Sequence, residues 1–156
     1  YNEFAWRQIM DEIAPRGDAL LTAPAPGSGW PALADCLGHV IMAYEVWIEA
    51  LHGKPRVAED GAPPIKTLGE LERFASRVRN RFRDYLASLS DEQLFGDIEV
   101  NAFGDLLAYT PAEILGNTVL HERGHHGDVN TLLYQHGIDS GVPDYRFFVN
   151  EKRGYE

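Results

Sequence analysis

Apolar residues recur at alternating steps of three and four along the segment 33–51, and this periodicity limits the fold more than any other feature of the sequence. Such spacing is typical of an amphipathic α-helix with one face turned toward a core. The pattern follows Pro31, which suits the first turn of a helix, and a second stripe opens with the potential capping box of Thr67 and Glu70. The apolar positions are Leu33, Leu37, Val40, Tyr44, Trp47 and Leu51 in the first stripe and Leu71, Phe74, Val78, Phe82, Tyr85 and Leu89 in the second.

Two further helical segments lie near the ends of the chain. Residues 1–14 carry apolar side chains near helical spacing until Pro15 ends the pattern. The segment 110–136 opens with Thr110 in the position of an N-cap and stops at Gly137. Each of these helices has one apolar face, and each face needs a partner to cover it.

The stretch before the last helical segment lacks helical periodicity. There the sequences IEV and LLAY flank NAFGD, which is typical of a short hairpin. Four amphipathic helices with so little strand predict an all-α fold, a four-helix bundle with a short hairpin before the last helix. A length of 156 residues suits one domain over 1–156.

Charge and hydropathy narrow the range of partners. The chain has 24 acidic and 14 basic residues, and the net charge of −10 would repel nucleic acid and anionic lipid. No apolar run approaches the roughly 20 residues of a membrane span. The single cysteine, Cys36, agrees with a reducing compartment. We expect a cytoplasmic protein that binds neither nucleic acid nor membrane, although a chain that begins at Tyr1 leaves open whether a signal peptide preceded it.

Three of the six histidines fall on predicted core faces. His121 and His125 are four residues apart in the last helix, so their side chains point the same way and can chelate one ion. His39 lies beside the apolar stripe of the segment 33–51. If these two helices were parallel neighbours, the three imidazoles would meet at a similar depth. We therefore predict that His39, His121 and His125 bind one metal ion in the core of the bundle.

The ligand set also indicates the metal. Three imidazoles without a carboxylate or thiolate favour a divalent transition-metal ion, zinc or nickel in the first place, over magnesium or calcium. Three protein ligands leave a position open for water or substrate, as in catalytic sites. The other histidines fit simpler roles, since His52 and His136 lie at helix C-termini. His126 is expected to face away from the predicted seam of the last helix, which consists of Thr118, His121, His125, Val129 and Leu132.

A different interpretation starts from residues 121–125, whose sequence HERGH matches the H-E-x-x-H motif of zincins. In such a metal-dependent hydrolase, Glu122 would be the general base. Glu151 would be the third ligand, because Thr131 stands where the extended motif needs a histidine. The chain has scarcely any strand on which a peptide could align, so this interpretation ranks second.

Several neighbouring side chains have both a functional and a structural interpretation. Cys36 lies one turn before His39, yet a buried, inert cysteine is the commoner case. Glu122 and Asp128 can orient an imidazole N–H, although solvated helix faces explain most such carboxylates. We expect the arginine-rich run 77–85 to be a solvated face whose stems cover apolar surface.

With these residues placed, the chain resembles the DinB/YfiT-like family of metal-dependent enzymes over nearly its whole length. Three stretches carry the resemblance: YNEFAWRQIMDEI, CLGHVIMAYEVWIEAL and LGNTVLHERGHHGDVNTLLYQHGI. The family's last-helix pattern is usually H-x-x-x-H-R-G-Q, and His121 and His125 keep its two ligand positions. His126 and Asp128 replace the usual arginine and glutamine, which puts the surroundings of the ligands and the dimer contacts in doubt.

The resemblance implies an up-down-down-up bundle with a long crossover between the second and third helices, frequently as a homodimer. It also implies a thiol-dependent transferase or isomerase that uses bacillithiol, mycothiol or glutathione and a small-molecule substrate. A thiolate held on a metal ion stays ionised at neutral pH and can attack an electrophilic carbon. We therefore expect a metal-dependent S-transferase of detoxification or stress responses, with an HExxH hydrolase and a non-catalytic, metal-stabilised bundle as the alternatives.

Overall fold

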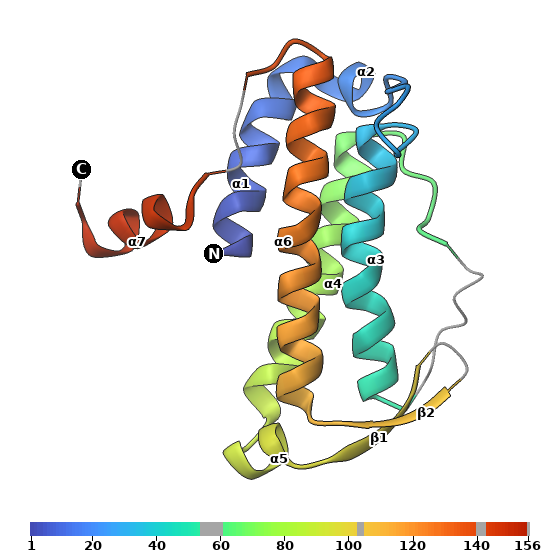
Figure 1. Cartoon of the computed structure of the whole chain (residues 1–156), viewed down its shortest axis with the longest axis vertical. Coiled ribbons are helices and arrows are strands. Elements are labelled where there is room, and N and C mark those ends of the chain that lie inside the picture. Colours follow the sequence, from blue (N-terminus) through green and yellow to red (C-terminus); the bar gives the residue numbers. More distant parts are fainter. Residues whose placement is uncertain (54–60, 103–104, 140–142, 156) are drawn as a thin grey trace.

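Four long helices form the body of the protein. The computed structural model describes residues 1–53, 61–102, 105–139 and 143–155. Figure 1 shows that the first and last long helices run one way and the two middle ones the other, so the predicted up-down-down-up bundle is confirmed. The four helices are α1 (Asn2–Ile13), α3 (Leu33–Leu51), α4 (Leu68–Ser88) and α6 (Pro111–Gln135).

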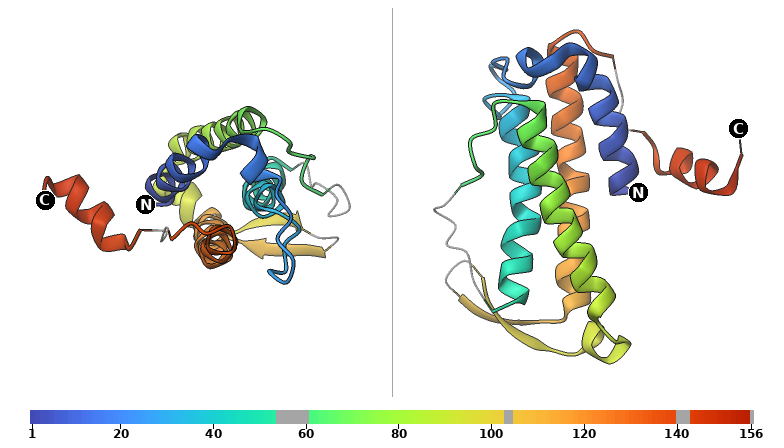
Figure 2. Two further views of the ribbon diagram at one scale, coloured as in Figure 1. Left: turned by 90° about the horizontal axis from the view of Figure 1, so that it is seen from above. Right: turned by 180° about the vertical axis from the view of Figure 1, so that it is seen from behind.

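Shorter elements occupy the connections and the C-terminal region. A 3₁₀ turn at 14–16 joins α1 to α2 (Gly17–Leu21), α5 (Asp91–Phe95) follows α4, and α7 (Tyr145–Arg153) follows α6. These three short helices lie outside the predicted ones. Figures 1 and 2 show that α7 projects from the side of the bundle next to α1. The ring of Tyr1 contacts those of Tyr145 and Phe148 and attaches α7 there.

The predicted hairpin is present at the end of the bundle where α3 stops and α6 begins (Figure 1). Strands β1 (Ile98–Ala102) and β2 (Asp105–Tyr109) pair antiparallel, with Val100 opposite Leu107. Val100 is buried against Ala50 and Ile114 in a small second core cluster. The hairpin therefore covers a small apolar cluster at this end of the bundle.

Side-chain hydrogen bonds at the helix starts explain why the predicted boundaries hold. At α4 the Thr67 hydroxyl accepts from the backbone N–H of Glu70, whose carboxylate accepts from the N–H of Thr67. Thr110 and Glu113 form the same capping box at α6. At the other end of α6, Gly137 has a φ of +74°, a left-handed conformation that favours glycine.

The relative direction of α3 and α6 differs from the arrangement assumed for the histidines. The two helices pack against each other and run antiparallel (Figure 1). The assumption of parallel neighbours is therefore wrong, because α4 runs in the same direction as α3 and α6 then returns. Antiparallel packing still sets His39, near the start of α3, beside His125, in the later half of α6.

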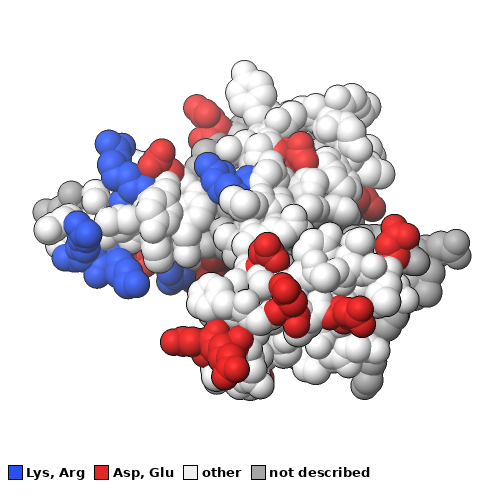
Figure 3. All heavy atoms as spheres, turned by 60° about the horizontal axis from the view of Figure 1, so that its bottom comes forward, with Lys and Arg blue, Asp and Glu red and all other residues white. Residues whose placement is uncertain are grey.

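The main core lies between the four long helices, which surround a common centre in the end-on view of Figure 2. Acidic side chains are scattered over the hairpin end of the molecule, whereas basic ones gather on the side of α7 (Figure 3). Among the described residues, no helix is long and apolar enough to cross a membrane. The largest fully buried side chains are Ile13, Leu21, Leu33, Leu37, Ile41, Ile48, Leu71, Ile114, Leu132, Leu133, Glu122 and Val78.

Candidate metal centre

The three predicted histidines meet where α3 packs on α6. The Nε2 atom of His121 lies 3.2 Å from Nε2 of His39 and 3.2 Å from Nε2 of His125. Their ring centroids are between 4.5 and 5.1 Å apart. One nitrogen of each ring belongs to a group whose ligand atoms all lie within 4.8 Å of one another. The structure thus brings together the residues that the sequence singled out.

This histidine cluster lies at the edge of the core and not inside it. All three residues are half-buried, and the side chain of His125 is 19% exposed. The buried line of α6 runs through Thr118, Glu122 and Val129, one step round the helix from His121. The predicted seam is therefore slightly off the face that the other helices cover. The cluster is therefore partly exposed to solvent.

The positions of the ring protons leave nitrogen lone pairs that one shared cation can bind. Nδ1 of His125 lies 2.7 Å from Oδ2 of Asp128, and this bond places a proton on Nδ1 because a carboxylate only accepts. A neutral His125 then turns an Nε2 lone pair toward His121. A single N–H on His121 Nε2 can serve only one of its two neighbours, whereas one cation can bind all three lone pairs. Two nitrogens on a tetrahedral zinc ion lie roughly 3.3 Å apart, close to the spacing here.

The electrostatics of the cluster favour the neutral form of His39 and of His121. Burial lowers the pKa of His39 and of His121, and the neighbouring ring of His125 lowers both further. Neutral rings are the form in which histidine binds a metal. The hydrogen bond from His125 lowers the pKa of Asp128, and the indole N–H of Trp30 adds to this effect. Asp128 is therefore a stable anion beside the cluster. It orients the ring of His125, so its functional interpretation fits the structure.

A second set of potential ligand atoms adjoins the cluster and shares His125. It consists of Cys36, His125 and Asp128. Burial raises the pKa of the Cys36 thiol to about 12, with smaller contributions from Asp128 and Asp35. A fully buried, protonated thiol is a poor ligand. The inert interpretation of Cys36 therefore fits, and the three histidines remain the better donor set.

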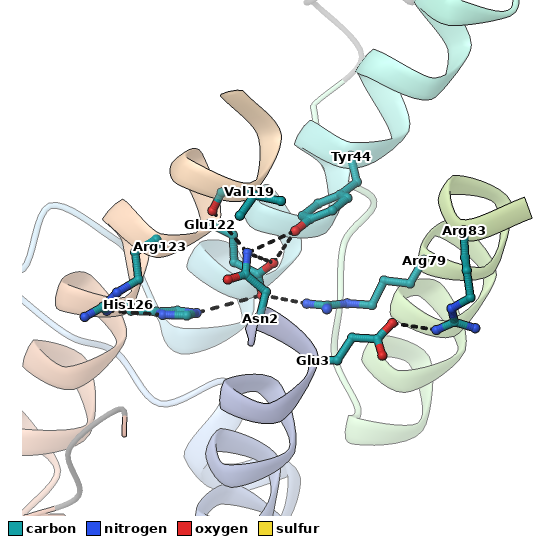
Figure 4. Close-up of polar contacts among 9 residues, drawn as sticks. All are labelled: Asn2, Glu3, Tyr44, Arg79, Arg83, Val119, Glu122, Arg123 and His126. Atoms are coloured by element: carbon teal, nitrogen blue, oxygen red, sulfur yellow. Dashed lines mark hydrogen bonds and ion pairs between the residues drawn. The ribbon is translucent and has the colours of Figure 1, made fainter. Parts of the chain in front are cut away.

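Glu122 lies about 100° round α6 from His121, as 3.6 residues per turn requires, in a buried polar network (Figure 4). Its carboxylate accepts hydrogen bonds from Arg79 at 2.6 Å, from Asn2 at 2.9 Å and from the hydroxyl of Tyr44. Nε2 of His126 lies 3.8 Å from the same carboxylate. Each of the four long helices contributes at least one side chain to this tie. The interpretation of Glu122 as part of a solvated helix face is therefore wrong. His126 faces away from the metal cluster, as expected, but it is buried.

The charges around Glu122 fix its protonation state. Burial by itself raises the pKa of this carboxyl group, but the nearby ring of His126, the charge of Arg79 and the Tyr44 hydroxyl together lower it to about 2. Burial and the Glu122 charge raise the pKa of Tyr44 in turn. Glu122 is thus an anion whose oxygens are occupied by donors.

This arrangement does not suit the zincin interpretation. Among the described residues, the histidine group contains no carboxylate, and Glu122 is held by its partners on another face of α6. Glu151, the suggested third ligand, instead faces Arg7 at 3.4 Å on the projecting α7. The hydroxyl of Thr131 donates to the backbone carbonyl of Gly127. Neither the base nor the third ligand of a zincin is in place.

The arginine-rich run of α4 is more than a solvated face. The side chain of Arg79 is only 10% exposed and pairs with Glu122. The interpretation of the run as a solvated face is therefore wrong for this residue. Its neighbours pair across helices at more exposed positions, where such bonds contribute little. These pairs are Arg77 with Glu45, Arg81 with Glu49 and Arg83 with Glu3.

Sequence reasoning missed one aromatic residue at the cluster. The indole of Trp30 packs against His39 in a tilted arrangement and against His125 edge-to-face, with ring centroids 5.1 and 5.5 Å apart. Its position directly before the histidine-bearing helix, at the end of a Gly-rich loop, is the signal that could have identified it. The predicted C-terminal positions of His52 and His136 agree with the structure, where they are the C-caps of α3 and α6.

Comparison with known families fixes the relationship of the chain. The model of the DinB family matches residues 1–154. The chain belongs to the DinB family. Within this DinB-family member, Asp128 stands where glutamine is usual and accepts a hydrogen bond from His125. His126 stands where arginine is usual and lies buried beside Glu122. No curated protein matches the chain.

Proposed function

We propose that this DinB-family protein is a metal-dependent enzyme that transfers a low-molecular-weight thiol onto a small electrophile. The observation that carries the proposal is the convergence of three half-buried imidazole nitrogens, from His39, His121 and His125, within 4.8 Å of one another. These residues are the proposed ligands of one divalent ion, zinc or nickel. Half-burial supports catalysis, since a purely structural site is usually closed.

The chemistry asks for a thiolate at neutral pH. A divalent ion held by the three histidines would act as a Lewis acid and lower the pKa of a bound thiol. In the reaction a sulfur–carbon bond forms, the leaving group departs with its electron pair, and the thiol proton passes to solvent. The residues of the chain hold the ligands in place, with Asp128 keeping the proton of His125 on Nδ1.

Metal binding is tested with single alanine variants. The purified protein should contain one zinc or nickel ion per chain by elemental analysis. His39→Ala, His121→Ala and His125→Ala should each lose most of it, because two imidazoles hold the ion more weakly than three. His52→Ala and His136→Ala are matched controls at helix ends and should retain it. Stoichiometric metal in His39→Ala would refute the proposed ligand set.

The reaction class needs a separate assay. We would incubate the metal-loaded protein with bacillithiol, mycothiol or glutathione and a chromogenic aryl halide, and follow the thioether product. Wild type should accelerate transfer of at least one thiol, and His125→Ala should not. A protein that holds its metal but transfers none of these thiols would not be the proposed transferase.

We further propose that the protein is a cytoplasmic homodimer, as its family resemblance implies. Exposed apolar side chains on the outer face of α6 support self-association, since Leu120 is 70% and Tyr134 73% exposed. Light scattering during gel filtration should give twice the mass of the chain. Leu120→Arg should shift the mass toward the monomer without changing helicity, whereas a monomeric wild type would contradict the proposal.

A further inference from the structure

The loop before α3 is built to hold Trp30 over the histidine cluster. The hydroxyl of Ser28 lies within hydrogen-bond distance of the carbonyls of Ala25 and Trp30, donates its one proton to either of them, and accepts from the N–H of Trp30 at 3.1 Å. Gly27 and Gly29 adopt φ values of +82° and +85°, which other residues rarely tolerate. The backbone N–H of Ala25 donates across the loop to the carbonyl of Pro31. The position of the indole is therefore set by local structure.

One carboxylate oxygen joins this loop to the cluster. Oδ2 of Asp128 accepts from the indole N–H of Trp30 at 3.1 Å and contacts Nδ1 of His125 at 2.7 Å. Trp30 is separated from Asp128 by 98 residues in sequence. The three side chains form a chain of contacts that ends at the Nε2 atom proposed to bind metal.

The chemistry of the indole gives this chain of contacts a direction. A tryptophan N–H only donates, and an ionised carboxylate only accepts, so neither group can reverse its role. The side chain of Asp128 is 41% exposed and would be free to turn into solvent without a second anchor. Anchored by Trp30, it keeps the proton of His125 on Nδ1 and the Nε2 lone pair turned toward His121.

We propose that Trp30 is a positioning residue of the metal centre, acting through Asp128 on the tautomer and orientation of His125. This inference rests on the proposed metal site, and it adds a loop residue to the four side chains already placed there. Partners that orient a metal-binding histidine typically contribute about 10- to 100-fold to metal affinity. Loss of the indole N–H alone should therefore weaken metal binding.

The test compares variants by metal affinity and does not depend on turnover. Trp30→Phe keeps an aromatic ring over His39 but removes the N–H. We expect its affinity for Co²⁺ or Ni²⁺, measured by competition with a chromophoric chelator, to fall about 10-fold. Trp47→Phe, in which a tryptophan of α3 is changed at the hairpin end, is the matched control and should bind like wild type. Thermal unfolding of each apo variant checks that the bundle is intact.

A double-mutant comparison separates positioning from general packing. If Trp30 acts through Asp128, Trp30→Phe in an Asp128→Ala background should cause no further loss of affinity. Wild-type affinity in Trp30→Phe, or losses that multiply in the double variant, would overturn the inference. A wild type that binds metal but transfers no thiol would refute the proposed reaction alone, and a wild type that binds no metal would refute both.

Discussion

The carboxylate of Glu122 is an ion enclosed within a helical bundle. It is 1% exposed and is surrounded by Arg79, Asn2, Tyr44 and His126 (Figure 4). Removing one partner of a buried charge pair leaves the other charge without compensation. The free energy lost in this way is larger than the net free energy that the intact pair contributes. Glu122 therefore has a structural role.

We predict that Glu122→Gln retains its metal and much of any thiol-transfer activity but loses stability. The amide still meets Tyr44 and Asn2, yet Arg79 becomes an uncompensated buried cation. The free energy of unfolding should fall by about 3 kcal/mol in urea titrations. Glu49→Gln breaks the partly exposed pair with Arg81 and should cost less than about 1 kcal/mol.

Two results would contradict this prediction. Unchanged stability in Glu122→Gln would mean that the network of Figure 4 does not hold the helices together. Peptide cleavage by the wild type, lost in Glu122→Gln with the metal still bound, would restore Glu122 as a general base worth about 10²- to 10⁴-fold.

Helical periodicity explains how much of the site could be predicted. The four-residue spacing of His121 and His125 fixes their common direction whatever surrounds them. The burial of Glu122 could not be predicted, because it depends on which helices cover the adjacent face. The sequence places Trp30 directly before the histidine-bearing helix, but its contact with Asp128 could not be predicted, since Asp128 lies on a distant helix.

The capping box of Thr110 and Glu113 defines where α6 begins. The backbone N–H of Thr110 lowers the pKa of Glu113 by donating to its carboxylate, and the hydroxyl of Thr110 lowers it further. The ionised carboxylate therefore stabilises the fold above the unfolded pKa, and this contribution is lost as the pH falls through the lowered folded value.

Thr110→Ala should lower the free energy of unfolding by about 1 kcal/mol, because the backbone N–H of Glu113 loses its acceptor. For a chain of this size the melting temperature should fall by about 2 to 4 °C, as followed by circular dichroism. Thr131→Ala, on the exposed side of the same helix, is the control and should melt within a degree or so of wild type. Equal losses in both variants would mean that the cap has no special role.

Elements with strong end signals are the ones that the sequence predicts well. The starts of α4 and α6 follow from their capping boxes, and the ends of α3 and α6 from Gly53 and Gly137. Helices of five residues such as α2 and α5 carry too little periodicity to be recognised. The antiparallel packing of α3 and α6 is a property of the connections, and helix spacing alone contains no information about it.

The folding of the bundle should not depend on the ion. The main core extends over all four long helices and lies beside the histidine cluster without including it. Chelation should leave the far-ultraviolet circular dichroism unchanged and lower the melting temperature only by linkage. The corresponding loss in the free energy of unfolding is about 2.7 kcal/mol for an ion present at 100 times its Kd. Collapse of the helices on chelation would favour a non-catalytic, metal-stabilised bundle.

The helix α6 carries two pairs of side chains at the same four-residue interval, His121 with His125 in the histidine cluster and Glu122 with His126 in the buried network of Figure 4. Deleting one residue between 112 and 120 would turn the later part of the helix by about 100° and move it by about 1.5 Å relative to the hairpin. Both pairs would then leave their partners at once, whereas a substitution removes one at a time. In a library of single-residue deletions, the interior of α6 should therefore be intolerant of changes in length even at exposed positions where it accepts changes of residue.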